Sequence, residues 1–250
     1  FVSGIEGAGN DLTINFTQAS TVDGFNNVHN FTSLSAVELN GSFSTTGAQN
    51  YAGQMTLLGN TTLVAGSGFI KIDGLSDGGV GYGLTVGNAT STADVTLAGN
   101  TTIASLVSAP GNFSVSLTGT NNTLGAANFQ HTGVLGIGND ETDRTFVPGG
   151  ITAPNVSLSQ LGGTFATNGS AITFNDISLL ANATLDATNN NLAPAGNNVL
   201  VSGGLALNSY TLVTKTGTAA TEVEGDVTIQ NGTVKVGQGS LDIGVGNTSA

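Results

Sequence analysis

Residues 56–63 read TLLGNTTL, and residues 96–103, which lie 40 positions later, read TLAGNTTI. In both segments a short alternating apolar run ends in Gly-Asn, and two threonines follow. Most intervals between such asparagines are close to one or two multiples of about 20 residues, which is typical of a repeat protein. A looser form of the pattern, an apolar run followed by asparagine, recurs at Asn40, Asn122, Asn182, Asn208 and Asn231.

A period of this length predicts the coils of a parallel β-helix (β-solenoid), with about 20–25 residues in each coil. Each coil would supply two or three short strands, and each strand would pair with its equivalent one coil later at a spacing of about 4.8 Å. Apolar side chains would point inward, and glycine and asparagine would occupy the corners because they tolerate left-handed backbone angles. We therefore expect Asn60 and Asn100 to share one column of corners. The alternative fold is an antiparallel β-sandwich that serves as a filament subunit.

Alternating runs of three to five residues predict short strands along the whole chain. No helix is expected, because Gly, Asn, Thr and Ser interrupt every apolar stretch. We predict a single β-helix domain over residues 1–250. Residues 131–154 contain two prolines, several glycines and a dense group of charges, and they predict a loop excursion between two solenoid blocks. The expected strands lie at 12–16, 37–39, 55–57, 69–72, 84–86, 95–97, 115–117, 205–207, 227–229 and 234–236.

The charge of the chain excludes some partners. The formal net charge is −12, and the basic residues are Lys71, Arg144, Lys215 and Lys235. Phosphate binding depends on lysine and arginine, so nucleic acid is not an expected partner. No apolar run approaches the roughly 18 residues that a membrane helix needs, so membrane insertion is not expected either. There is no cysteine, which excludes disulfides and thiolate metal sites.

The segment from Phe25 to Leu97 resembles the repeats of bacterial filamentous-haemagglutinin-like proteins and related giant adhesins. The strongest part is residues 45–57, TTGAQNYAGQMTL, which is similar to a T-T-G-x-Q-x-Y-x-G/D-x-V-T-L block; the segments 34–43 and 61–70 resemble the flanking blocks. The resemblance implies a right-handed parallel β-helix, export to the cell surface, and adhesion or matrix building. Many such proteins leave the cell by two-partner secretion. Their Asn-Pro-Asn secretion motif does not occur here, so we expect a later repeat region or another export route.

The expected function is therefore that of a structural and adhesive extracellular rod that contacts a host-cell or matrix surface. The alternative is a subunit of a self-assembling extracellular filament, because an uncapped β-helix exposes strand edges on which copies can stack end to end. A carbohydrate-binding or carbohydrate-cleaving β-helix is less favoured, because Tyr51, Tyr82 and Tyr210 are few and dispersed. Catalysis is not expected: the basic residues are scattered, and His29 and His131 are far apart in sequence and are expected on the surface.

One group of carboxylates is a candidate metal site. Asp140, Glu141 and Asp143 lie beside Arg144 in the expected loop. Three carboxylates within four residues could bind Ca²⁺, which prefers flexible oxygen ligands. The competing interpretation is a solvated acidic loop, and no other cofactor is expected.

Asn-x-Ser/Thr sequons are abundant, and they have two interpretations. They could carry glycans on an exported protein. They could also follow from the coil pattern itself, in which asparagine turns the corner and threonine opens the next strand. The candidate residues are Asn15, Asn30, Asn40, Asn60, Asn88, Asn100, Asn112, Asn121, Asn155, Asn168, Asn182, Asn231 and Asn247.

Overall fold

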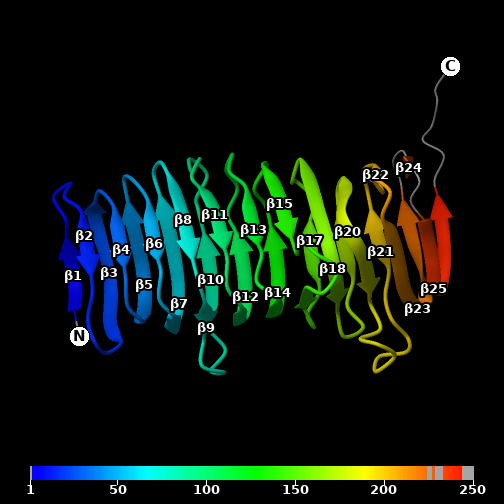
Figure 1. Ribbon diagram of the computed structural model, residues 1–250, viewed down its shortest axis with the longest axis horizontal. Helices are drawn as coiled ribbons and strands as arrows, with labels where there is room; N and C mark the ends of the chain where they lie inside the picture. The colour runs from blue at the N-terminus through cyan, green and yellow to red at the C-terminus, as the bar shows by residue number, and fades with distance from the viewer. Residues whose placement is uncertain (1, 224–226, 229–232, 244–250) are drawn as a thin grey trace, which may run out of the picture. The chain divides into compact units, whose positions relative to one another are not determined.

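The computed structural model describes residues 2–223, 227–228 and 233–243. This part of the chain is all-β and contains no helix, and it forms a right-handed parallel β-helix (Figure 1). The predicted fold class is confirmed, and the antiparallel sandwich is wrong, because each described strand pair is parallel. The chain divides into two compact units, Phe1–Leu124 with Gln130–Gly133, and Gly125–Phe129 with Val134–Ala250.

In the first unit, the strands of successive coils pair in three columns. The first column is β2, β4, β6, β8, β11 and β13. The second and third columns are built largely from β3, β5, β7 and β12, long strands that bend and serve both columns, together with β1, β9 and β10. The bounds are β1 Val2–Glu6, β2 Leu12–Ile14, β3 Ser20–Val28, β4 Phe31–Ser33, β5 Val37–Thr45, β6 Gln49–Tyr51, β7 Met55–Ala65, β8 Phe69–Ile72, β9 Leu75–Ser76, β10 Gly83–Val86, β11 Asp94–Leu97, β12 Thr101–Ser108 and β13 Val115–Leu117.

The second unit repeats the same three-column plan. Its second column is β16, the end of β18, the end of β20, and the beginnings of β23 and β25. The bounds are β14 Asn121–Phe129, whose last five residues belong to this unit, β15 Val134–Ile137, β16 Arg144–Phe146, β17 Ile151–Ala153, β18 Leu158–Ala166, β19 Ile172–Phe174, β20 Ile177–Asp186, β21 Val199–Val201, β22 Leu205–Ala206, β23 Thr211–Val223, β24 Val227–Thr228 and β25 Thr233–Ile243.

The interior of each unit is made of inward-pointing side chains that stack in register. Val22, Leu39 and Leu57 pair in sequence through the second column of the first unit, and each is 0–1% exposed. Phe25 and Phe43 also pair in register, and their rings meet edge to face with centroids 5.1 Å apart. Because alternate residues of a strand point to opposite faces, the strict alternation seen in the sequence puts one apolar row inside and one polar row outside.

The interior of the first unit also contains a satisfied polar pair. The Tyr51 hydroxyl, fully buried, donates to Gln49 Oε1 at 2.9 Å. Gln49 Nε2 in turn donates to the carbonyl oxygens of Phe43 and Val64, at 3.1 and 2.9 Å. Every polar atom of this pair therefore has a partner, which is the condition for burying such groups without a large penalty.

Coil length varies more than the predicted 20–25 residues. Val22 pairs with Leu39, only 17 positions later, whereas Ala183 pairs with Leu212, which is 29 positions later. In the longer coil, twelve residues, 187–198, form the turn between β20 and β21, which accounts for most of the difference.

The prediction that Asn60 and Asn100 share a column is wrong. Met55 pairs with Leu75, and Leu75 with Thr101, so two coils occupy 46 positions here and not 40. Asn60 lies at the bend between the second and third columns, and Asn100 lies between the first and second. The turns at 77–82 and 87–93 insert the additional residues, so the 40-residue sequence repeat does not coincide with two coils.

Most of residues 131–154 is not the predicted loop excursion. The segment contains β15, β16 and β17, which pair in parallel with β18 and β19. Only the turn at residues 138–143 leaves the column between β15 and β16. Both prolines and most of the glycines of this segment lie in the turns between β15, β16 and β17 or next to them, and these closely spaced turns made three short strands look like one loop.

We expect Tyr51→Phe to destabilise the first unit. The substitution keeps the ring but leaves Gln49 Oε1 buried without its donor, so the free energy of unfolding should fall by about 1–3 kcal/mol in urea titrations. Tyr210→Phe is the matched control, because Tyr210 is 37% exposed and its loss should change stability by less than about 0.5 kcal/mol.

The same variant has a pH signature. Burial raises the pKa of Tyr51 well above its usual value of 10. The folded protein therefore keeps Tyr51 neutral while the unfolded chain ionises it, so this contribution to stability is complete below pH 10 and is lost as the pH rises beyond it. The measurement is the free energy of unfolding of the wild type and of Tyr51→Phe at a series of pH values. If the two free energies fall in parallel above pH 10, Tyr51 is not the group whose ionisation destabilises the folded protein.

Candidate functional site

An outward-facing row of side chains crosses the second column of the second unit. Because each strand pairs in register with the next, one residue from each of five strands stands in the row. Arg144 pairs with Thr164, Thr164 with Thr184, Thr184 with Val213, and Val213 with Lys235. The row joins β16, β18, β20, β23 and β25, and its members come from across 92 positions of the sequence.

A groove of about 500 Å³ lies over four members of this row, from Thr164 to Lys235. Its walls combine a carboxylate, an amide, an ammonium group and several hydroxyls, together with small apolar side chains. The polar lining residues include Glu141, Thr164, Asn182, Thr184, Thr211 and Lys235.

Hydrogen bonds fix the rim of the groove. Asn182 Nδ2 donates to Glu141 Oε2 at 3.0 Å, and Asn182 Oδ1 accepts from the backbone N–H of Thr211 at 3.0 Å. Asn182 is thus held by a neighbouring coil while it holds the Glu141 side chain in turn. A polar surface that is already fixed loses little conformational entropy when it binds a ligand.

The basic residues are less scattered in the fold than the sequence suggested. Arg144, Lys215 and Lys235 all lie in the second column of the second unit, on β16, β23 and β25. Lys215 Nζ lies 3.7 Å from Asp186 Oδ2, and the Arg144 guanidinium lies 5.6 Å from the centre of the Phe146 ring. Within the described residues, no ion pair involves Arg144 or Lys235.

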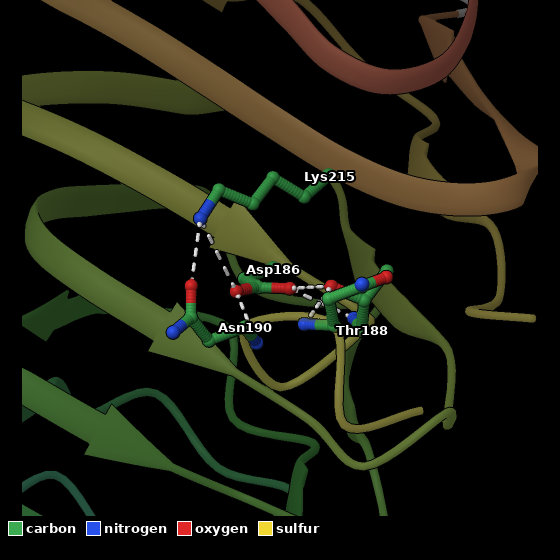
Figure 2. A network of polar contacts seen from close by, with 5 residues as sticks. Asp186, Thr188, Asn190 and Lys215 are labelled. Atoms are coloured by element: carbon green, nitrogen blue, oxygen red, sulfur yellow. Dashed lines mark hydrogen bonds and ion pairs between the residues drawn. The ribbon is translucent and has the colours of Figure 1, made fainter. Parts of the chain in front are cut away.

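A buried aspartate organises the long turn that follows β20 (Figure 2). Asp186 is 3% exposed; its Oδ1 accepts from the N–H and hydroxyl of Thr188 at 2.8 and 2.6 Å, and its Oδ2 accepts from the N–H of Asn190 at 2.8 Å. Lys215 Nζ approaches both Asp186 and Asn190 Oδ1, the latter at 3.5 Å. Asn189, Asn190 and Asn191 have φ of 49°, 54° and 71°, a left-handed conformation that asparagine tolerates. The aspartate therefore anchors a turn whose backbone would otherwise be unsatisfied.

The same arrangement recurs at two other turns. Asp77, which is 4% exposed, accepts N–H bonds from Gly79, Gly81 and Tyr82 at 2.8, 3.0 and 3.0 Å. Asp143, also 4% exposed, accepts from the N–H groups of the turn that precedes it. These carboxylates serve the backbone of their own turns.

The structure does not assemble the predicted calcium site. Asp140 Oδ1 accepts from the N–H and hydroxyl of Thr142, both at 2.7 Å, and these bonds lower the pKa of Asp140. Glu141 is held by Asn182, and Asp143 is turned toward the backbone. Within the described part of the chain, no three acidic or histidine side chains converge as metal ligands. The carboxylates are neighbours in sequence but are directed at different donors.

The two histidines differ in environment. His29 is exposed, with Nδ1 3.1 Å from the hydroxyl of Thr46. His131, expected on the surface, is instead fully buried: its Nδ1 lies 2.7 Å from Ser108 Oγ and its ring stacks on Phe113 at 5.4 Å. The prediction for His131 was wrong because a histidine that follows a strand can point inward as well as outward, and Ser108 gives it a polar partner there.

The described sequon asparagines lie on the surface, and several connect neighbouring coils. Asn30 is half-buried, and Asn231 and Asn247 lie outside the described residues. The Oδ1 atoms of Asn30, Asn60, Asn100 and Asn182 accept backbone N–H bonds at 2.9–3.0 Å from Ala48, Gly83, Asn121 and Thr211, one coil later. The exposed sequon residues are Asn15, Asn40, Asn60, Asn88, Asn100, Asn112, Asn121, Asn155, Asn168 and Asn182.

One sequon is a turn motif. Asn88 Oδ1 accepts from the N–H and hydroxyl of Thr90, both at 2.9 Å. Asp140 with Thr142, and Asp186 with Thr188, form the same pair of bonds although neither aspartate can carry an N-glycan. The pattern Asn/Asp-x-Thr is therefore a local turn in this fold, which supports the corner interpretation; glycan attachment stays a prediction.

No family model, curated protein or solved structure matches the chain. The resemblance of residues 25–97 to the giant adhesins thus stays a prediction. The described residues contain no helix that is long and apolar enough to cross a membrane.

We expect Asn60→Ala to lower the free energy of unfolding by about 0.5–1.5 kcal/mol, because the N–H of Gly83 loses its acceptor. Asn60→Asp is the matched control: it also destroys the sequon but keeps an acceptor oxygen, so it should lose less. The comparison uses urea unfolding of protein made without glycosylation. Equal losses in the two variants would show that the amide oxygen has no role between coils.

We expect Asp186→Ala to loosen the turn at residues 187–198. The N–H groups of Thr188 and Asn190 lose their acceptor, which should cost about 1–3 kcal/mol. Limited proteolysis followed by mass spectrometry should then show faster cleavage within this turn. Cleavage at the wild-type rate would mean that the aspartate does not hold the turn.

Proposed function

We propose that the chain is a structural and adhesive segment of a bacterial surface or secreted protein, and that it contacts a host cell or an extracellular matrix. The observation that carries the proposal is the continuous parallel register of coils within each unit. A stack of this kind is extended by adding coils, and each coil is stabilised by its neighbours. In the first unit, the six described strands of the first column span roughly 24 Å along the stack at the usual spacing between strands.

The outer faces of the stack suit contact with an extended partner. In the first column of the first unit, the outward row is polar and regularly spaced; in order it is Thr13, Thr32, Asn50, Lys71, Thr96 and Ser116. Small polar side chains at intervals of about 4.8 Å form a hydrated surface that can make many weak contacts. The resemblance of residues 25–97 to giant adhesins supports an extracellular location.

We expect antibodies against the chain to label intact producing cells, or to detect it in their medium. Beads coated with the folded chain should bind a host-cell or matrix layer more than beads coated with the urea-unfolded chain, because the outward rows exist only in the folded state. Detection only after lysis would refute the extracellular location. Equal binding by folded and unfolded coats would refute an adhesive role.

A further inference from the structure

We propose that the groove of the second unit binds a neutral oligosaccharide along the row from Thr164 to Lys235. The inference rests on the proposed adhesive function and names the ligand class of one surface.

The lining favours a ligand that both donates and accepts hydrogen bonds. Glu141 only accepts, Lys235 only donates, and the threonine hydroxyls do both. Sugar hydroxyls also do both, so they can pair with every type of group present. The apolar side chains among the described lining residues are those of Ala183 and Val213, which are too small to form the kind of apolar pocket that selects a hydrophobic ligand.

The charges of the groove select a neutral ligand. Among the described lining residues, the charged groups are one carboxylate and one ammonium group, Glu141 and Lys235, whose formal charges cancel. The chain as a whole has a net charge of −12, which repels an acidic polymer at longer range. A polyanion or an acidic peptide would therefore gain one favourable contact while meeting the carboxylate and the field of the protein.

The shape of the groove suits a linear chain. Thr164, Thr184 and Val213 stand on three successive coils at a spacing of about 4.8 Å, and Lys235 stands on the fourth. The volume of about 500 Å³ is within the usual range for small-ligand sites, and the groove lies on the outer face of the column. The Asn182 bonds to Glu141 and Thr211 hold the rim in place before a ligand arrives.

The test is calorimetric titration of the whole chain with cellotetraose, maltotetraose and mannotetraose, and with tetragalacturonate as the charged comparison. We expect at least one neutral tetrasaccharide to bind. Thr184→Val keeps the side-chain shape and removes a central hydroxyl, and Glu141→Ala removes an exposed carboxylate; each should weaken binding at least fivefold while the thermal midpoint stays near that of the wild type.

The control is Thr85→Val in the first unit. Thr85 pairs with Thr62 and Val107, so it occupies a row that matches Thr164, Thr184 and Val213 in chemistry but does not line this groove. It should leave binding unchanged. The proposal is overturned if no neutral tetrasaccharide binds, if Thr85→Val and Thr184→Val weaken binding equally, or if tetragalacturonate binds more tightly than every neutral sugar.

The bead assay separates this inference from the proposed function. If wild-type beads adhere and no tetrasaccharide binds, the groove assignment fails and the adhesive role stands. If a tetrasaccharide binds and folded beads do not adhere better than unfolded ones, the sugar site stands and the adhesive role fails.

Discussion

Parallel hydrogen bonding between successive coils is the constraint on which the rest of this structure depends. It continues through the corners as well as the strands, as in the bonds from the N–H of Val37 to the carbonyl of Gln54 and from the N–H of Met55 to the carbonyl of Gly74, each 2.9 Å. Once the backbone is held in this way, each side chain has an equivalent directly above and below it. The inward columns, the outward rows and the asparagine bonds between coils all follow from that one relation.

The alternating runs were sufficient to predict the fold class and ten of the 25 described strands, because a period of two is visible even in a run of three residues such as Val115-Ser116-Leu117. The register was not predictable. The sequence repeat around Asn60 and Asn100 falls at two different corners of the coil, because the turns between them make two coils longer than 40 residues. The groove residues were missed for the same reason. Thr164 and Lys235 stand in one row, but this can be predicted only if the length of every intervening turn is known. The calcium prediction failed for another reason. The carboxylate oxygens of Asp140 and Asp143 accept hydrogen bonds from N–H groups of their own turn, which the spacing of the acidic residues does not reveal.

The polar groups of the interior were also hidden from sequence reasoning. Gln49 and His131 would be assigned to the outer row by their chemistry, yet both are fully buried. Each is matched by a specific partner, Tyr51 and Ser108 respectively. A stack of similar apolar coils could slip by one coil at little cost, whereas a buried polar pair is satisfied in only one alignment. The His131–Ser108 pair, which joins residues 23 positions apart, therefore favours one register, whereas the Gln49–Tyr51 bond lies within β6 and does not depend on the register.

The unequal coils have an evolutionary consequence. A residue added within a strand would turn every following side chain to the opposite face, but a residue added in a turn leaves both flanking columns aligned. The turn after Asp186 shows how far this tolerance extends, since it carries the chain from β20 to β21 without disturbing the pairing of either strand. A lineage can therefore lengthen, shorten or decorate such turns freely, and new surface loops can arise on this scaffold without any change to its interior.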